Sequence, residues 1–119
     1  MQTVDLGEFT VGEGHPPRIM GVLNMSIESN WNPSVESAPD NAARLAKEML
    51  SNGADIIDIG LQSANPKNDW LPPEVEFERL NKALAVIDQV DDDSAVFSIE
   101  TRYSEVADEA LSGGFDIVN

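Results

Sequence analysis

The sequence predicts an α/β fold in which strands alternate with helices around a parallel sheet. Short apolar segments bounded by turn residues recur along the chain and have the length of buried strands. Segments with apolar residues at helical spacing separate them. Such alternation implies right-handed crossovers between parallel strands. Two architectures dominate this class, the doubly wound sheet and the eight-stranded barrel, and the pattern alone leaves both open.

The first part of the chain is predicted to form a hairpin, a turn and one buried strand. Residues 3–11 alternate weakly between polar and apolar and break at Gly7, as in a short hairpin. Residues 12–17 form a turn that two prolines close. Residues 18–24 (RIMGVLN) then have the composition of a buried strand, and this strand ends on the polar side chain of Asn24.

A loop, a helix and a second strand are predicted next. Residues 25–40 are rich in Ser, Asn and Pro, which is typical of a loop. A helix is expected to begin at Pro39, which suits a first helical turn, and to end at Gly53 with a left-handed cap. Its apolar face consists of Ala42, Leu45, Ala46 and Met49. Residues 54–60 (ADIIDIG) form the second predicted strand.

The same alternation continues to the last residue of the sequence. Residues 61–72 form a polar loop, and Pro73 opens a second helix. The apolar residues at helical spacing in that helix are Phe77, Leu80, Leu84 and Ile87. Residues 95–100 (AVFSIE) are the third predicted strand, residues 104–111 a short helix, and residues 115–118 the start of a fourth strand.

Composition excludes several classes of protein. The 119 residues carry 22 acidic and 7 basic side chains, a net charge of −15, which disfavours a nucleic-acid partner because phosphates would be repelled. This charge indicates a halophilic cytoplasm, with an ordinary acidic protein as the alternative. There is no cysteine, no signal-peptide pattern and no apolar run long enough to span a membrane. We therefore expect a cytoplasmic protein without a membrane partner.

Each predicted strand ends in polar residues at its carboxyl side. These are Asn24 with Ser26, Gln62 with Ser63, Glu100 with Thr101 and Arg102, and Asn119. In parallel α/β folds ligands bind at this edge. One such residue could merely satisfy loop backbone groups, but the repetition at four strands favours a binding site. No phosphate-binding loop or dinucleotide fingerprint is present, and His15, the single histidine, falls in a turn.

Four segments resemble, in order, the signatures of the dihydropteroate synthase family. They are IMGVLNMS at 19–26, GADIIDIGLQSANP at 53–66, FSIET at 97–101 and DIVN at 116–119. The resemblance covers essentially the whole chain and looks closest to archaeal versions. It implies the N-terminal half of a (β/α)8 TIM barrel, with residues 1–119 forming four strand units and a leading hairpin of one pterin-binding domain. A complete barrel needs about 250 residues, so we expect this portion alone to be inactive.

The resemblance also implies an activity and residue roles. The family condenses 6-hydroxymethyl-7,8-dihydropterin diphosphate with 4-aminobenzoate in folate biosynthesis and uses Mg²⁺. Asn24 aligns with the residue that touches Mg²⁺ or diphosphate, and Glu100 and Asn119 align with the residues that bind the pterin ring. The loops expected to close over the aminobenzoate contain Ser26, Glu28, Ser29, Gln62 and Ser63. No catalytic residue is assigned, and a homodimer of the full-length protein is expected.

Some positions depart from the family pattern. Glu100 stands where the family has an aspartate. Residues 62–67 (QSANPK) replace the usual Glu-Ser-Thr-Arg-Pro-Gly, so that an arginine and a threonine hydroxyl are missing. Lys67 or Arg102 could supply the missing positive charge. These departures leave two alternatives, a pterin-binding methyltransferase and a non-catalytic pterin-binding paralogue.

Overall fold

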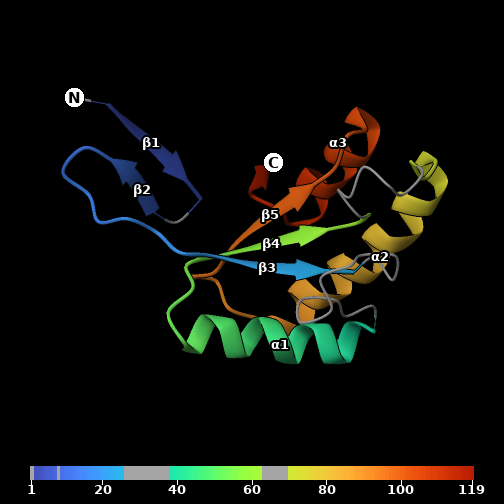
Figure 1. The fold of residues 1–119 in the computed structure, drawn as a ribbon, viewed down its shortest axis with the longest axis horizontal. Coiled ribbons are helices and arrows are strands. Elements are labelled where there is room, and N and C mark those ends of the chain that lie inside the picture. The colour runs from blue at the N-terminus through green and yellow to red at the C-terminus, as the bar shows by residue number, and fades with distance from the viewer. Residues whose placement is uncertain (1, 8, 26–37, 63–69) are drawn as a thin grey trace.

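The computed structural model describes residues 2–7, 9–25, 38–62 and 70–119 and contains a four-stranded parallel sheet (Figure 1). Its strands are β3 (Met20–Asn24), β4 (Ile56–Gly60), β5 (Val96–Glu100) and β6 (Ile117–Val118). They lie side by side in chain order, and every neighbouring pair is parallel. A doubly wound sheet reverses its strand order at a switch point, whereas a barrel does not. The fold class is therefore that of part of a TIM barrel.

Within the described residues, three helices connect the strands and cover one face of the sheet: α1 (Pro39–Ser51), α2 (Pro73–Val90) and α3 (Ser104–Gly113). A proline in the first turn starts α1 and α2, as predicted. Gly53 follows α1 with φ 112°, and Asp91 ends α2 in the left-handed conformation. Helix α3 extends to Gly113, beyond the predicted end at residue 111, because the chain leaves the helical path only at Gly114, where φ is 130°.

The core lies between the sheet and the helices. On the sheet side it contains Leu23, Ile57, Ile59, Phe97 and Ile99. Alanines 42, 43 and 46 are the buried residues of α1, and the predicted Leu45 and Met49 are partly buried beside them. The predicted apolar face of α2 does pack against the core, although only Leu80 of its four residues is fully buried. The buried residues of the helix are Glu76, Leu80, Ala83, Val86 and Val90, whereas Phe77, Leu84 and Ile87 are only partly buried.

The predicted hairpin is confirmed and consists of β1 (Thr3–Leu6) and β2 (Phe9–Gly12), paired antiparallel. It lies at the amino-terminal end of the sheet (Figure 1). Gly7, between the two strands, has φ 62° and packs closely: a Cβ there would lie 3.1 Å from Cγ2 of Val96. The hairpin therefore covers the start of β5 and leaves the carboxyl edge of the sheet uncovered.

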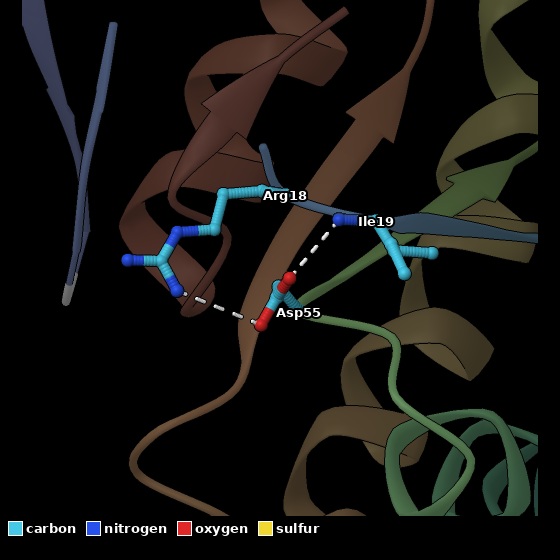
Figure 2. A network of polar contacts seen from close by, with 3 residues as sticks. All are labelled: Arg18, Ile19 and Asp55. Carbon is cyan, nitrogen blue, oxygen red and sulfur yellow. Dashed lines mark hydrogen bonds and ion pairs between the residues drawn. The ribbon is translucent and has the colours of Figure 1, made fainter. Parts of the chain in front are cut away.

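A polar contact fixes this amino-terminal edge (Figure 2). The carboxylate of Asp55, just before β4, accepts a hydrogen bond from the backbone N–H of Ile19 at 3.0 Å. Its other oxygen lies 3.8 Å from the guanidinium of Arg18, which in turn lies over the Phe9 ring at 4.5 Å. These contacts join β2 to the starts of β3 and β4. Strand β3 begins at Met20, two residues later than predicted.

Candidate functional site

The carboxyl ends of the strands lie level with one another. Asn24 is opposite Gly60, and Gly60 is opposite Glu100. Asn119 directly follows β6, and its backbone N–H donates to the carbonyl of Ile99 at 2.8 Å. Because side chains alternate along a strand, Asn24 and Glu100 lie on the face opposite the helices. The structure thus brings Asn24, Glu100 and Asn119 to one edge.

Gly60 occupies the space between two of these polar side chains. A Cβ built on it would lie 2.6 Å from Oδ1 of Asn24 and 3.8 Å from Oε2 of Glu100. The amide oxygen and the carboxylate therefore converge above the glycine. A ligand at this position would meet two oxygen acceptors from different strands.

The ionisation of Glu100 is altered by its surroundings. Burial raises the pKa of this carboxyl above the ordinary glutamate value, because the charged form loses hydration. The negative charges of Asp58 and Glu76 raise the pKa further, while Arg102 acts in the opposite direction. Perturbed carboxyls of this kind are concentrated at binding and catalytic sites, although ion-pair networks also produce them.

A cavity of about 150 Å³ opens at this edge and is lined by Gln62, Glu76, Glu100, Thr101, Arg102 and Asn119. The guanidinium of Arg102 lies over the indole of Trp70, 3.8 Å from the ring centroid. Such stacking suits arginine because its planar cation is weakly hydrated. The cavity therefore combines carboxylate and amide groups with a cation that stacks on an aromatic ring.

Glu76 is a cavity residue that the sequence analysis missed. It lies in the first turn of α2 and is fully buried. Its two carboxylate oxygens accept hydrogen bonds from Nε2 of Gln62 and from Oγ1 of Thr101. The available signal was its spacing: Glu76 lies four residues before Leu80, on the buried side of the helix, where an isolated carboxylate is unfavourable.

Asp58 is a second polar residue that sequence reasoning missed. It lies on β4 with only 3% of its surface exposed. Nδ2 of Asn119 approaches its Oδ1 at 3.4 Å, which links β4 to the residue after β6. Strand alternation could have identified Asp58, because it lies two residues before Gly60 and so on the same face as Asn24 and Glu100.

Of the loop residues that the sequence predicts for the site, the structure describes Gln62. Both polar atoms of the Gln62 side chain are hydrogen-bonded. Its Nε2 donates to the Glu76 carboxylate, and its Oε1 accepts from the backbone N–H of Leu71 at 3.0 Å. The hydroxyl of Tyr103 donates to the carbonyl of the same Leu71. The predicted residues Ser26, Glu28, Ser29, Ser63 and Lys67 lie outside the described residues.

The donor set at the edge suits a hard cation. Asn24 and Glu100 present oxygen atoms, which Mg²⁺ prefers, and no thiolate or imidazole lies among the cavity residues. Among the described residues no group of three or more acidic or histidine side chains forms a metal cage. Mg²⁺ commonly binds through one or two protein oxygens together with substrate phosphates. The residues present fit that mode of binding.

The parallel strands lie side by side in chain order, and a polar cavity opens at their carboxyl ends. This arrangement defines the class of barrel-type α/β proteins that bind ligands at this edge. Comparison with known families then identifies which one. The family described as pterin binding enzyme matches residues 20–119. The chain therefore belongs to the pterin-binding enzyme family.

Individual relatives agree with this assignment. A probable bifunctional folylpolyglutamate synthase/dihydropteroate synthase of Halobacterium salinarum is 36% identical over 107 residues, which cover 90% of this chain and 13% of that protein. The dihydropteroate synthase of Neisseria meningitidis serogroup C is 35% identical over 115 residues, covering 95% and 39%. The chain thus spans well under half the length of these relatives.

Solved structures show the same likeness. The dihydropteroate synthase of Yersinia pestis, in complex with a sulfonamide drug, superposes with a TM-score of 0.81 and 26% identity, over 99% of this chain and 41% of that one. The Anaplasma phagocytophilum enzyme, with bound 6-hydroxymethylpterin-monophosphate, superposes with a TM-score of 0.70 and 30% identity, over 86% of this chain and 36% of that one.

None of the helices in the described ranges has the length and apolar character needed to cross a membrane.

Proposed function

We propose that this chain supplies the first four strands of a dihydropteroate synthase barrel that acts in folate biosynthesis. The observation that carries the proposal is the convergence of the Glu100 carboxylate and the Asn119 amide on one cavity at the strand ends. Two solved relatives support it: one contains 6-hydroxymethylpterin-monophosphate, and the Burkholderia cenocepacia enzyme contains 7,8-dihydropteroate.

Glu100 and Asn119 have the chemistry to bind a pterin. The ring presents adjacent N–H donors, which an ionised carboxylate can accept in pairs, and a carboxylate has no competing donor. The amide of Asn119 both donates and accepts. Its contact with Asp58 directs the NH₂ group toward β4 and so fixes the orientation of the amide.

The reaction joins an arylamine to the pterin methylene carbon. The amine nitrogen forms a bond to that carbon while the bond from the carbon to the diphosphate oxygen breaks, and the amine proton passes to solvent. Mg²⁺, when bound, would neutralise charge on the departing diphosphate. Asn24 would hold this ion through its amide oxygen, and Arg102 would attract the anionic parts of the substrates at the cavity rim.

Diphosphate release tests the proposal. The full-length protein, in high-salt buffer, is given the dihydropterin diphosphate and 4-aminobenzoate. Release that depends on both substrates and on Mg²⁺ is expected. Tight pterin binding without release would contradict the synthase and favour the methyltransferase or the non-catalytic paralogue.

We also propose that the parent protein works in a cytoplasm rich in salt. The net charge of −15 over 119 residues and the similarity to a Halobacterium salinarum protein support this proposal. A dense acidic surface is strongly self-repulsive unless salt screens it. The protein is therefore expected to be better folded in molar KCl than in dilute buffer. Equal folding and solubility in both would contradict the proposal.

A further inference from the structure

We propose that Glu76 is a positioning residue of this site, whose carboxylate joins the β4–α2 loop to the β5–α3 loop and thereby fixes the wall of the pterin cavity. The inference rests on the proposed function for the identity of the ligand. The side chain is fully buried, and it accepts from Gln62 in one loop and from Thr101 in the other. It is thus a shared acceptor for two segments that are far apart in the sequence.

Further contacts extend this junction. Gln62 accepts from the N–H of Leu71 at 3.0 Å, and the Tyr103 hydroxyl donates to the carbonyl of Leu71. Oγ1 of Thr101 also accepts from the N–H of Tyr103 at 3.2 Å. The beginning and the end of the β4–α2 loop are therefore tied both to each other and to the β5–α3 loop, with Glu76 at the centre of the network.

Helix packing does not explain the carboxylate. A buried charge is unfavourable unless hydrogen bonds compensate its lost hydration, and a leucine at this position would continue the buried stripe toward Leu80. Arg79, on the same helix, also reaches this loop and donates to the carbonyl of Leu61 at 2.7 Å. The first turns of α2 therefore serve to hold the loop.

Loss of the junction should affect ligand binding. Gln62, Thr101 and Arg102 line the cavity beside Glu100, so movement of either loop changes the distances between them. Small displacements of binding groups weaken affinity because the lost order must be restored on binding. We therefore expect weaker pterin binding and a higher KM, with a smaller change in kcat.

The experiment compares Glu76→Leu with Glu76→Gln in the full chain. The leucine removes both acceptors and should weaken binding of 6-hydroxymethyl-7,8-dihydropterin about tenfold or more, measured by calorimetry. The glutamine can still accept from Gln62 and donate to the Thr101 oxygen, so affinity should recover to within about threefold of the wild type. Glu78→Leu is the matched control, because Glu78 is exposed on the same helix. It should leave affinity unchanged.

A second readout needs no ligand. Hydrogen exchange of the Leu71 amide should accelerate in Glu76→Leu and stay slow in Glu76→Gln and Glu78→Leu. If Glu76→Leu does not fold, Thr101→Val serves instead. It removes, at nearly constant shape, the hydroxyl that donates to Glu76 and accepts from the N–H of Tyr103, and it should accelerate the same exchange. Unchanged exchange and unchanged affinity in these variants would overturn the inference. A wild-type protein that binds no pterin, with exchange changed as expected, would instead overturn the proposed function and leave the junction standing.

Discussion

Gly60 makes room for the side chain of Asn24. The hypothetical Cβ of residue 60 lies 2.6 Å from Oδ1 of Asn24, so the polar end of β3 can lean over β4 only because residue 60 has no side chain. The position that we propose for Mg²⁺ and diphosphate therefore depends on two residues from different strands. This dependence can be tested.

Asn24→Ala should lower turnover by about tenfold or more and leave folding nearly unchanged. The reason is that an oxygen ligand is lost from the partly exposed end of a strand, where packing changes little. Diphosphate release measures the first effect, and urea unfolding the second. Wild-type turnover in this variant would count strongly against the assigned role.

Gly60→Ala should reduce turnover in a similar way, because the added methyl group displaces the Asn24 amide. The displaced atom is the end of a side chain, so the loss of stability should stay near 1 kcal/mol. In the double variant Asn24→Ala/Gly60→Ala there is no amide to displace. The turnover of the double variant should then equal that of Asn24→Ala alone. If its loss of turnover were instead the product of the losses in the two single variants, the two residues would act independently.

Glu100→Gln should weaken pterin binding about tenfold or more. The substitution replaces one of the two carboxylate oxygens, which accept hydrogen bonds, with an NH₂ group, which donates them. One N–H group of the pterin then faces another N–H group. Calorimetry with 6-hydroxymethyl-7,8-dihydropterin measures the change, and Glu105→Gln, an exposed position on α3, is a control that should bind normally. Equal affinity in Glu100→Gln would remove this residue from the pterin site.

The raised pKa of Glu100 predicts a pH-dependent stability. Its folded-state pKa lies above the ordinary glutamate value of 4.5, so the folded state binds the proton more tightly. The contribution of Glu100 to stability is then fully present below that value and is lost as pH rises through the folded pKa. Glu100→Gln should therefore gain stability over the wild type as pH rises toward neutrality, by less than about 1 kcal/mol because solvent screens the partly exposed group. Urea unfolding between pH 4 and pH 8, at constant salt, measures this difference, and a constant difference would contradict the assignment.

Arg102→Ala should weaken binding of the anionic substrate several-fold and affect the neutral hydroxymethyl pterin less, since the guanidinium supplies charge at the rim. Arg102→Lys should recover only part of the affinity, because lysine stacks less well on Trp70. Titrations with both pterins at two salt concentrations separate the charge effect. Equal losses for charged and neutral ligands would point to a structural role instead.

The sequence predicted the strand ends better than the cavity. Residues 24, 60 and 100 were placed correctly as carboxyl ends of strands, because a polar residue or glycine follows an apolar run at each of them. Glu76 was missed because amphipathic patterns assign charged residues to solvent, and only long-range contacts with Gln62 and Thr101 make its burial favourable. Strand β6 (Ile117–Val118) is shorter than the predicted residues 115–118, although Asp116 already donates its backbone N–H to the carbonyl of Phe97 in β5.

The parallel arrangement also has a consequence for how the site assembles during folding. Asn119 and Asp58 meet although 61 positions separate them, and two crossover helices must dock before they can do so. Contacts between distant parts of a chain form slowly because loop closure must come first. The end of the cavity that we propose for the pterin is therefore expected to be completed late in folding. During refolding, substitutions that loosen α3 should therefore delay the recovery of ligand binding more than they delay the recovery of the helical signal.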